Sequence, residues 1–376
     1  MPALANPQYP VLADYLRHFA RETPEAEALV HGDERWTYRQ LATAVDAFAK
    51  ALIGSGVGNG DRIVLLSSPR PLFFISLLAA SSVGAVWVGL HPRYKIGEMA
   101  HVIGEVKPKL VFAFRDIDGR DYANDVAELQ RRFPDIGGFI ALDRSWDGAV
   151  PVADFMARGM QVIVPANTIA ADAPAVIIFT SGSTGAPKGA VVSHHSLIHG
   201  ALIEADRWPV RNADAPRVLN NMPVNHIAGI GMIAVFTLLQ GGAQVFQDRF
   251  DAGELLHLIE TERVTLWLQS SAMFHFATVH PDYPQTDFSA LETIVWSGAP
   301  MARDIVTKLS RTGAQLSTAF GMTELGTYAT YSDPDADYDT LAAVIGKPEP
   351  RYELRIADVD DRPVAAGVQG EIQAHG

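Results

Sequence analysis

The chain of 376 residues contains no cysteine. This absence excludes disulfide bonds, thiolate metal sites and a cysteine nucleophile. Basic residues are also scarce: 30 lysines and arginines stand against 43 aspartates and glutamates, for a formal net charge of −13. A nucleic-acid partner is therefore not expected, because binding to a phosphate backbone needs a basic surface. Binding of a free nucleotide remains possible on these grounds, since a few local hydrogen-bond donors suffice to hold its phosphates.

A basic leader and an uninterrupted apolar span are missing as well. The first residues, MPALANPQYP, carry no positive charge and no apolar run, so we expect no signal peptide and a cytoplasmic location. Residues 71–90 are long enough to cross a bilayer, but Ser81, Ser82 and Gly84 divide them. A buried helix that leads into a Val-rich parallel strand explains this stretch better, so no integral membrane segment is expected.

Apolar residues are abundant, at 48% of the chain, and they form short strand-like runs that alternate with helix-length segments. This rhythm predicts an α/β fold of two mostly parallel βαβ sheets covered by helices, with a small β-rich module at the C-terminal end. The expected strands are residues 61–66, 85–90, 109–114, 139–142, 175–180, 217–221, 243–246, 264–268, 293–296, 351–356 and 371–374. The expected helices include residues 38–53, capped by Thr37, and residues 252–261 and 302–311.

The most informative segment is TSGSTGAPKG at residues 180–189, directly after the strand-like run AVIIF. Its glycines let the backbone approach a ligand, and its hydroxyls and Lys188 supply donors for phosphate oxygens. It is not a Walker loop, because Pro187 and Gly189 occupy the places of Gly and Ser or Thr. Pro187 favours extended backbone before it, so we expect a strand to follow. By composition alone, a surface hairpin rich in Gly and Ser is the alternative.

The order of these ten residues closely resembles the signature loop of the adenylate-forming, AMP-binding superfamily of acyl-CoA synthetases, luciferases and peptide-synthetase adenylation domains. Similar segments follow in order: MPVNHIAG (222–229) resembles the family's Pro-x-x-His segment, WSGAPM (296–301) its adenine-pocket turn, and STAFGMTE (317–324) its Tyr-Gly-x-Thr-Glu motif. Residues 345–356 and 367–376 resemble its late β module. The resemblance covers nearly the whole chain and is greatest to the large N-terminal domain of acyl-CoA synthetases.

The resemblance implies a role for each motif. The residues implied to grip the β- and γ-phosphates of ATP are Thr180, Ser181, Gly182, Ser183, Thr184, Gly185 and Lys188. Glu324 is implied as the Mg²⁺ ligand and Thr323 as a contact to the α-phosphate. The residues implied to surround adenine are Gly298, Ala299, Pro300, Ala319, Phe320 and Gly321. Phe320 stands where the family commonly has tyrosine.

Three histidines could have either functional or structural roles. The family pattern makes His226 a wall of the acyl pocket, near where the carboxylate and the thiol meet, but a core histidine is an equally good interpretation. Asn225 stands where many relatives have an aromatic residue. His194 and His195 are adjacent and have no suitably spaced third ligand, so a metal site is not expected there. We expect Ser193 to cap a helix and both histidines to be structural.

The function that the resemblance implies is an acid–CoA ligase with ATP, Mg²⁺ and coenzyme A. The pocket candidates are His226, Gly229, Ile230, Trp296, Gly326 and Thr327. They include no cation for a second carboxylate, which favours an apolar or aromatic monocarboxylic acid. The resemblance disfavours amino-acid activation, because domains of that kind usually carry an aspartate in this segment, whereas residues 224–227 contain no acidic side chain. An acyl-AMP ligase that loads a carrier protein and a non-catalytic nucleotide-binding module both stay open, as does a homodimer.

The domain organisation follows from the same resemblance. We expect a first α/β subdomain at residues 1–170, a second at residues 171–340 with the phosphate loop and the acyl and adenine pockets, and the start of the β module at residues 341–376. The family's C-terminal domain with its catalytic lysine is expected to be absent, because Gly376 precedes the family's ribose-binding Thr-Gly-Asp motif. Full turnover by this chain alone is therefore not expected.

Overall fold

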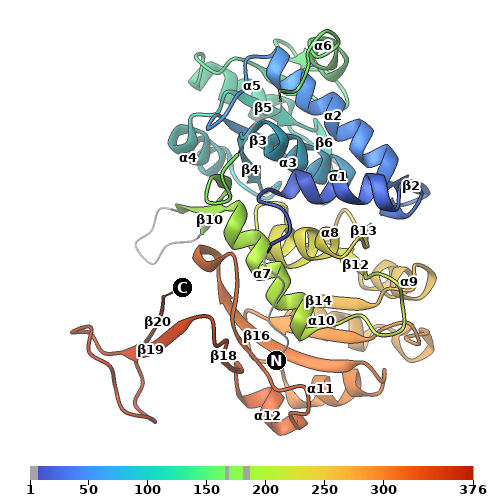
Figure 1. Ribbon diagram of the computed structural model, residues 1–376, viewed down its shortest axis with the longest axis vertical. Helices are drawn as coiled ribbons and strands as arrows, with labels where there is room; N and C mark the ends of the chain where they lie inside the picture. Colours follow the sequence, from blue (N-terminus) through green and yellow to red (C-terminus); the bar gives the residue numbers. More distant parts are fainter. Residues whose placement is uncertain (1–6, 166–168, 181–186, 376) are drawn as a thin grey trace. The chain divides into compact units, whose positions relative to one another are not determined.

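The computed structural model describes residues 7–165, 169–180 and 187–375 (Figure 1). The chain divides into two compact units, Met1–Asp251 and Ala252–Gly376. Both units combine strands with helices, and most strand pairs are parallel, so the expected α/β class is confirmed. The finer division at residues 170 and 340 stays a prediction.

A seven-stranded sheet in the first unit has the order β11-β10-β4-β3-β5-β8-β9. Its strands are β3 (Arg62–Leu66), β4 (Val86–Leu90), β5 (Leu110–Ala113), β8 (Phe139–Ala141), β9 (Val150–Pro151), β10 (Pro174–Thr180) and β11 (Lys188–Ser193). All neighbouring pairs are parallel except β10 and β11, which are antiparallel. The strands expected in this region are confirmed to within a residue or two at each end.

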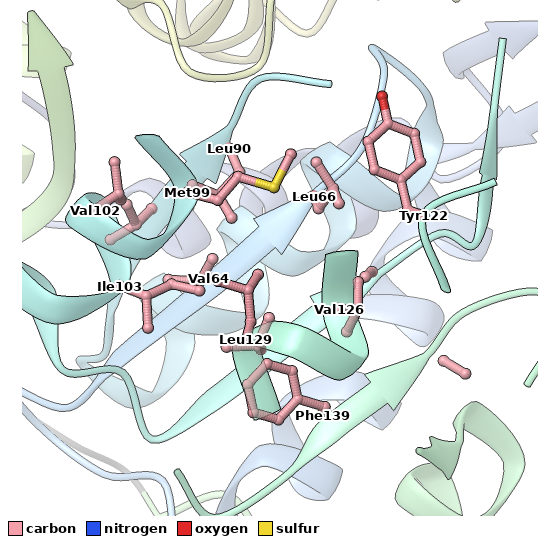
Figure 2. Packing of buried hydrophobic residues seen from close by; sticks show 14 of the residues in the cluster. Val64, Leu66, Leu90, Met99, Val102, Ile103, Tyr122, Val126, Leu129 and Phe139 are labelled. Atoms are coloured by element: carbon pink, nitrogen blue, oxygen red, sulfur yellow. The ribbon is translucent and has the colours of Figure 1, made fainter. Parts of the chain in front are cut away.

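Helices cover both faces of this sheet, and the side chains of each strand alternate between them. The helices of the first unit up to β12 are α1 (Leu12–Glu22), α2 (Tyr38–Gly54), α3 (Pro71–Val83), α4 (Ile96–Val106), α5 (Ala123–Arg132), α6 (Val152–Ala157) and α7 (His194–Arg207). Figure 2 shows Val64 and Leu66 of β3 in one buried cluster with side chains of α4 and α5. On the opposite face, Phe112 packs against Phe48 of α2 and Phe155 of α6, with ring centroids 5.2 and 5.0 Å away.

A second run of strands in the first unit has the order β12-β13-β1-β2. These strands are β1 (Glu27–His31), β2 (Glu34–Thr37), β12 (Arg217–Asn220) and β13 (Ala243–Phe246), with a small hairpin of β6 (Asp116–Ile117) and β7 (Arg120–Asp121) elsewhere in the unit. Only β1 and β2 pair antiparallel within the run. The π-helix η1 (Ala228–Val235) continues into α8 (Phe236–Leu239). The predicted cap is confirmed, since Thr37 and Gln40 form a reciprocal capping box at α2.

Helix α3 is the element that the apolar stretch at residues 71–90 produces. Every residue of α3 except Leu72 is buried. The helix ends at Gly84, whose φ of +75° lies in the left-handed region that terminates helices, and β4 follows. In the part of the chain that the structure describes, no helix combines the length and the apolar character needed to cross a membrane.

The second unit has three parallel strands and an antiparallel extension. Its strands are β14 (Leu266–Ser270), β15 (Thr293–Ser297), β16 (Gln315–Met322), β17 (Thr327–Tyr331), β18 (Lys347–Pro348), β19 (Glu353–Ala357) and β20 (Glu371–His375). Its helices are α9 (Ala252–Thr261), α10 (Ser271–Val279), α11 (Arg303–Ser310) and α12 (Tyr338–Ala343), with short 3₁₀ turns η2 (Tyr283–Gln285) and η3 (Thr323–Leu325). Strands β19 and β20 pair with each other in antiparallel register, which matches the strands expected at the C-terminal end.

Candidate functional site

The two ends of the phosphate loop meet at the end of one β-ladder. Thr180 is the last residue of β10 and Lys188 the first of β11, and the antiparallel register places them opposite each other. Thr180 is half-buried, whereas Lys188 is exposed. The strand expected after Pro187 is confirmed. The implied phosphate ligands that lie outside the described residues are Ser181, Gly182, Ser183, Thr184 and Gly185.

Gly189 allows the two strands below the loop to approach each other closely. It pairs with Phe179 across the ladder. A Cβ atom at this position would lie 2.9 Å from Cγ2 of Ile177, which is closer than real Cβ contacts, and 3.2 Å from Cζ of Phe179, which is a tight contact. The glycine after Lys188 therefore leaves room for the Phe179 ring next to the base of the loop.

The Pro-x-x-His segment forms a tight turn after β12. The backbone N–H of His226 donates to the Pro223 carbonyl at 3.0 Å, and that of Gly229 donates to the His226 carbonyl at 3.1 Å. Glycines let this turn pack closely. A Cβ atom at Gly89 of β4 would lie only 2.6 Å from the Val224 carbonyl oxygen. The turn is therefore seated directly on the seven-stranded sheet.

The His226 ring is held in one tautomer. Its Nδ1 atom accepts a hydrogen bond from the backbone N–H of Ala228 at 3.1 Å, so the ring proton lies on Nε2. The residue is exposed at its surface, but desolvation by the protein atoms around the ring lowers its pKa. At neutral pH the ring therefore presents an uncharged Nε2–H donor.

Tyr94 is a neighbour of this segment that sequence reasoning missed. The Nδ2 atom of Asn225 donates to the Tyr94 hydroxyl at 2.9 Å, and burial raises the pKa of Tyr94. The Tyr94 ring also lies 5.9 Å from the ring of His91, at the carboxyl end of β4. No sequence motif predicts this contact, since Tyr94 precedes Asn225 by 131 residues. This contact fixes the Asn225 amide against the Tyr94 phenol beside the turn.

The turn that the sequence predicts to border adenine, residues 298–300, lies at the carboxyl end of β15 in the second unit. Gly298 has a φ of +84°, which side chains other than glycine rarely adopt. The Ser271 hydroxyl donates to the Ala299 carbonyl at 2.7 Å. The three turn residues Gly298, Ala299 and Pro300 are exposed. This turn is thus fixed through its backbone while its outer surface stays open to a ligand.

The neighbouring strand β16 ends at the same edge, because Trp296 of β15 pairs in parallel with Thr318 of β16. The register of β16 with β17 shifts between Phe320 and Gly321. A Cβ atom at Gly321 would lie 2.4 Å from the Thr327 carbonyl oxygen, so a glycine is needed at this irregularity. Ala319 is buried and Phe320 half-buried. The structure thus brings residues 298–300 and 319–321 together.

Glu324 lies on the short turn η3, directly after β16, and is exposed, whereas Thr323 beside it is half-buried. Among the described residues, no three His, Asp or Glu side chains gather into a metal site. A single open carboxylate suits Mg²⁺, which usually takes one or two carboxylates together with water and substrate phosphates. It does not suit a metal held by protein ligands alone.

The helix expected after Ser193 is confirmed, and Ser193 caps it through the backbone N–H of Ser196 at 3.1 Å. His194 is completely buried, and burial lowers its pKa to about 4. Neither of its ring nitrogens has a hydrogen-bond partner within the described residues. This setting is that of an uncharged core residue.

The chain belongs to the family of AMP-binding enzymes, whose model matches residues 16–376. It is 30% identical over 360 residues to a feruloyl-CoA synthase from Amycolatopsis sp, covering 95% of this chain and 68% of that protein. It is 27% identical to an indoleacetate–CoA ligase from Aromatoleum aromaticum, covering 97% of this chain and 70% of that protein. The chain thus spans about two thirds of the length of these relatives.

Solved structures confirm the fold. An anthranilate CoA ligase, AuaEII, in complex with anthranoyl-AMP superimposes with a TM-score of 0.87 at 19% identity, over 98% of this chain and 70% of that one. The N-terminal domain of FACL13 from Mycobacterium tuberculosis superimposes with a TM-score of 0.81 at 22% identity, over 94% and 86%. At these identities the likeness shows the fold of adenylate-forming enzymes.

His194 predicts how stability depends on pH. Its pKa is lowered from 6.5 to about 4 in the folded chain, so the unfolded chain binds more protons between these values and stability falls as pH falls through this window. The shift corresponds to about 3 kcal/mol, present in full above the unfolded pKa. The variant His194→Gln should lose this part of the pH dependence, measured by chemical denaturation from pH 4 to pH 7.5.

Other groups titrate in the same range, so only the difference between the parent and the variant is informative. His280→Gln, which changes a half-buried histidine of the second unit, is the matched control and should keep the parent's slope. A His194→Gln slope equal to that of the parent would contradict the assignment.

Proposed function

We propose that this protein is an AMP-forming acid–CoA ligase. In the first step, a carboxylate oxygen of the acid attacks the α-phosphorus of ATP, the bond to the bridging oxygen breaks, and pyrophosphate leaves. In the second step, the thiol sulfur of CoA attacks the acyl carbon, the thiol proton is released, and AMP leaves. A carboxylate is already a nucleophile at neutral pH, so the first step needs no general base.

The observation that carries the proposal is the opposition of Thr180 and Lys188 at the carboxyl end of β10, in a chain whose relatives over 95% of its length are CoA ligases. Ligands of open α/β sheets bind outside the carboxyl ends of the strands. A threonine and a lysine at the two opposed ends of a Gly- and Ser-rich loop provide a hydroxyl and an ammonium group, which suit a polyphosphate.

The phosphate loop acts by neutralising charge. We assign the β- and γ-phosphates to Lys188 and Thr180, together with Ser181, Ser183 and Thr184. Negative charge builds on the departing pyrophosphate, so donors fixed before the reaction stabilise the transition state more than the bound substrate. The exposed position of Lys188 leaves its ammonium group available to such a ligand.

Further residues that the sequence resemblance implies are assigned to the rest of the nucleotide. Residues 298–300 and 319–321 enclose adenine, and Thr323 donates to the α-phosphate. Glu324 would hold Mg²⁺, which when bound screens the charge of the phosphate oxygens. The half-buried ring of Phe320 supplies an apolar face for the base.

The acid is proposed to bind beside the turn at residues 223–229. The neutral Nε2–H of His226 can donate to a carboxylate or carbonyl oxygen without forming an ion pair. Asn225 and Tyr94 form an uncharged polar wall. This wall offers no cation to a second carboxylate, and two relatives are named for feruloyl and indoleacetate substrates. We therefore propose an aromatic or otherwise apolar monocarboxylic acid.

The test of the proposed function is acid-dependent pyrophosphate release with a panel of benzoic, cinnamic, indoleacetic and straight-chain acids, followed by mass spectrometry of products with CoA. An aromatic or apolar monocarboxylic acid should release pyrophosphate and, with CoA, yield a thioester. A thioester formed on a pantetheinylated carrier protein but not on CoA would replace CoA as the acceptor. No acid-dependent release with any acid would contradict the proposed reaction.

Lys188→Ala should weaken ATP binding and leave AMP binding nearly unchanged, because the ammonium group contacts only the phosphates that AMP lacks. Loss of one charge-assisted hydrogen bond stabilising by about 1.5–3 kcal/mol corresponds to a rise in Kd of roughly 10- to 150-fold. Calorimetry with each nucleotide measures both constants. The exposed Lys109→Ala is the control. Equal losses for ATP and AMP would rule out a role at the polyphosphate.

Glu324→Gln keeps the size of the side chain and removes its charge, so it should raise the Mg²⁺ concentration needed for half-maximal adenylation by about tenfold or more. The measurement is a Mg²⁺ titration of pyrophosphate release at fixed ATP. Glu371→Gln, which changes an exposed glutamate on β20, should behave as the parent. An unchanged titration for Glu324→Gln would show that this carboxylate holds no metal during the reaction.

A further inference from the structure

We propose that His101 is a positioning residue for the phosphate loop: it holds the backbone just before Lys188 and thereby aims the lysine at the phosphates of ATP. The inference rests on the proposed function, because it assumes that Lys188 binds ATP. It assigns a role to a histidine that belongs to none of the sequence motifs and lies 86 residues before Pro187.

The contact that carries the inference is a hydrogen bond from the ring to the chain. The Nε2 atom of His101 lies 2.8 Å from the Pro187 carbonyl oxygen. A carbonyl oxygen can only accept, so Nε2 carries the proton. Pro187 lies one residue beyond the last ladder pair, Thr180 with Lys188, and as a proline it has no N–H to offer. His101 thus fixes this residue where the ladder does not.

The same ring touches the other side of the loop. His101 and Phe179 meet edge to face, with ring centroids 6.0 Å apart and an angle of 81° between the planes. Phe179 directly precedes Thr180, and Pro187 directly precedes Lys188. One side chain from α4 therefore contacts Phe179 of β10 and Pro187 directly before β11, at the base of the loop.

Helix α4 is a firm support for this ring. Met99, Val102 and Ile103 are each at most 1% exposed and lie in the buried cluster shown in Figure 2. Phe179 and Ile177 of β10 pack against that cluster as well. The helix and the strand are thus anchored in one core, and the position of the ring relative to Pro187 follows from close packing.

The test separates the hydrogen bond from the packing of the ring. His101→Phe keeps a ring against Phe179 but has no donor, whereas His101→Gln keeps an N–H donor of similar reach and loses the ring. Loss of one neutral hydrogen bond should raise the Kd for ATP about 3- to 10-fold in His101→Phe. The Kd for AMP should change less than about 2-fold, and His101→Gln should stay near the parent for both nucleotides. His257→Phe, an exposed histidine on α9, is the matched control.

Calorimetry on the purified chain with ATP and with AMP gives these constants, and thermal unfolding checks that each variant is folded. Unchanged ATP affinity in His101→Phe would overturn the inference. So would equal losses for ATP and AMP, because a general structural defect does not distinguish the nucleotides. If His101→Phe unfolds, a rise in the Kd for ATP in His101→Gln and not for AMP would also count against a donor role, since the donor is kept.

A double variant shows whether His101 acts through the lysine. On the Lys188→Ala background, His101→Phe should cause little further loss of ATP affinity, because the group that it positions is gone. Fully additive losses would overturn the inference. If Lys188→Ala alone weakens ATP and AMP equally, the proposed role of the loop fails; if Lys188→Ala separates the nucleotides and His101→Phe does not, only the present inference fails.

Discussion

Burial of both faces of the seven-stranded sheet is the constraint on which the rest of the structure depends. Val64 and Leu66 face α4 and α5, while the residue between them, Leu65, is equally buried on the opposite side. Neither face can be left to water, so a helix must follow nearly every strand. Polar residues of the sheet region therefore lie mainly at the ends of the strands. Thr180 at the end of β10 and His91 after β4 both lie at carboxyl ends, where the candidate site is assembled.

The elements of this fold could be read from the sequence because their signals are local. Short apolar runs predict buried strands. Thr37 and Ser193 predict helix starts, because their side chains can cap the first turn. Pro187 predicts extended backbone at the end of the phosphate loop, because proline lacks a backbone N–H and restricts the residue before it to extended conformations. The motif residues could also be predicted from the sequence, because the order of the motifs along the chain indicates the family.

What could not be read are contacts between side chains that are distant in sequence. His101 meets Pro187 across 86 residues, and Tyr94 meets Asn225 across 131. Neither member of these pairs has a neighbour that predicts its partner. The contacts depend on the folded chain, in which β10 pairs with β4 and the turn at residues 223–229 packs on β4 at Gly89. The register shift at Phe320 is similar, because a glycine at residue 321 has many possible causes until Thr327 is seen against it.

A polar cluster within the first unit shows the same limit of local signals. Arg70, at the start of α3, donates to Asp248 at 2.9 Å, and His31 at the end of β1 lies 3.0 Å from the other carboxylate oxygen. Burial opposes the charge of Asp248, but the hydrogen bond to His31 and the charge of Arg70 hold its pKa below the usual range. The cluster connects residues that follow strands of both sheet runs, so it ties them together at their carboxyl ends.

Charge balance explains the kinds of donor that the candidate site uses. The chain has a net charge of −13, and both proposed substrates of the first step, the acid and ATP, are anions, so long-range electrostatics oppose their approach and local groups must hold them. Lys188 suits the polyphosphate, where charge grows during the reaction. A cation held against the attacking carboxylate would instead stabilise the bound acid as much as the transition state and would gain no rate. Burial lowers the pKa of His226 and keeps the ring uncharged at neutral pH, so the acid can be oriented by a donor while its oxygen stays nucleophilic.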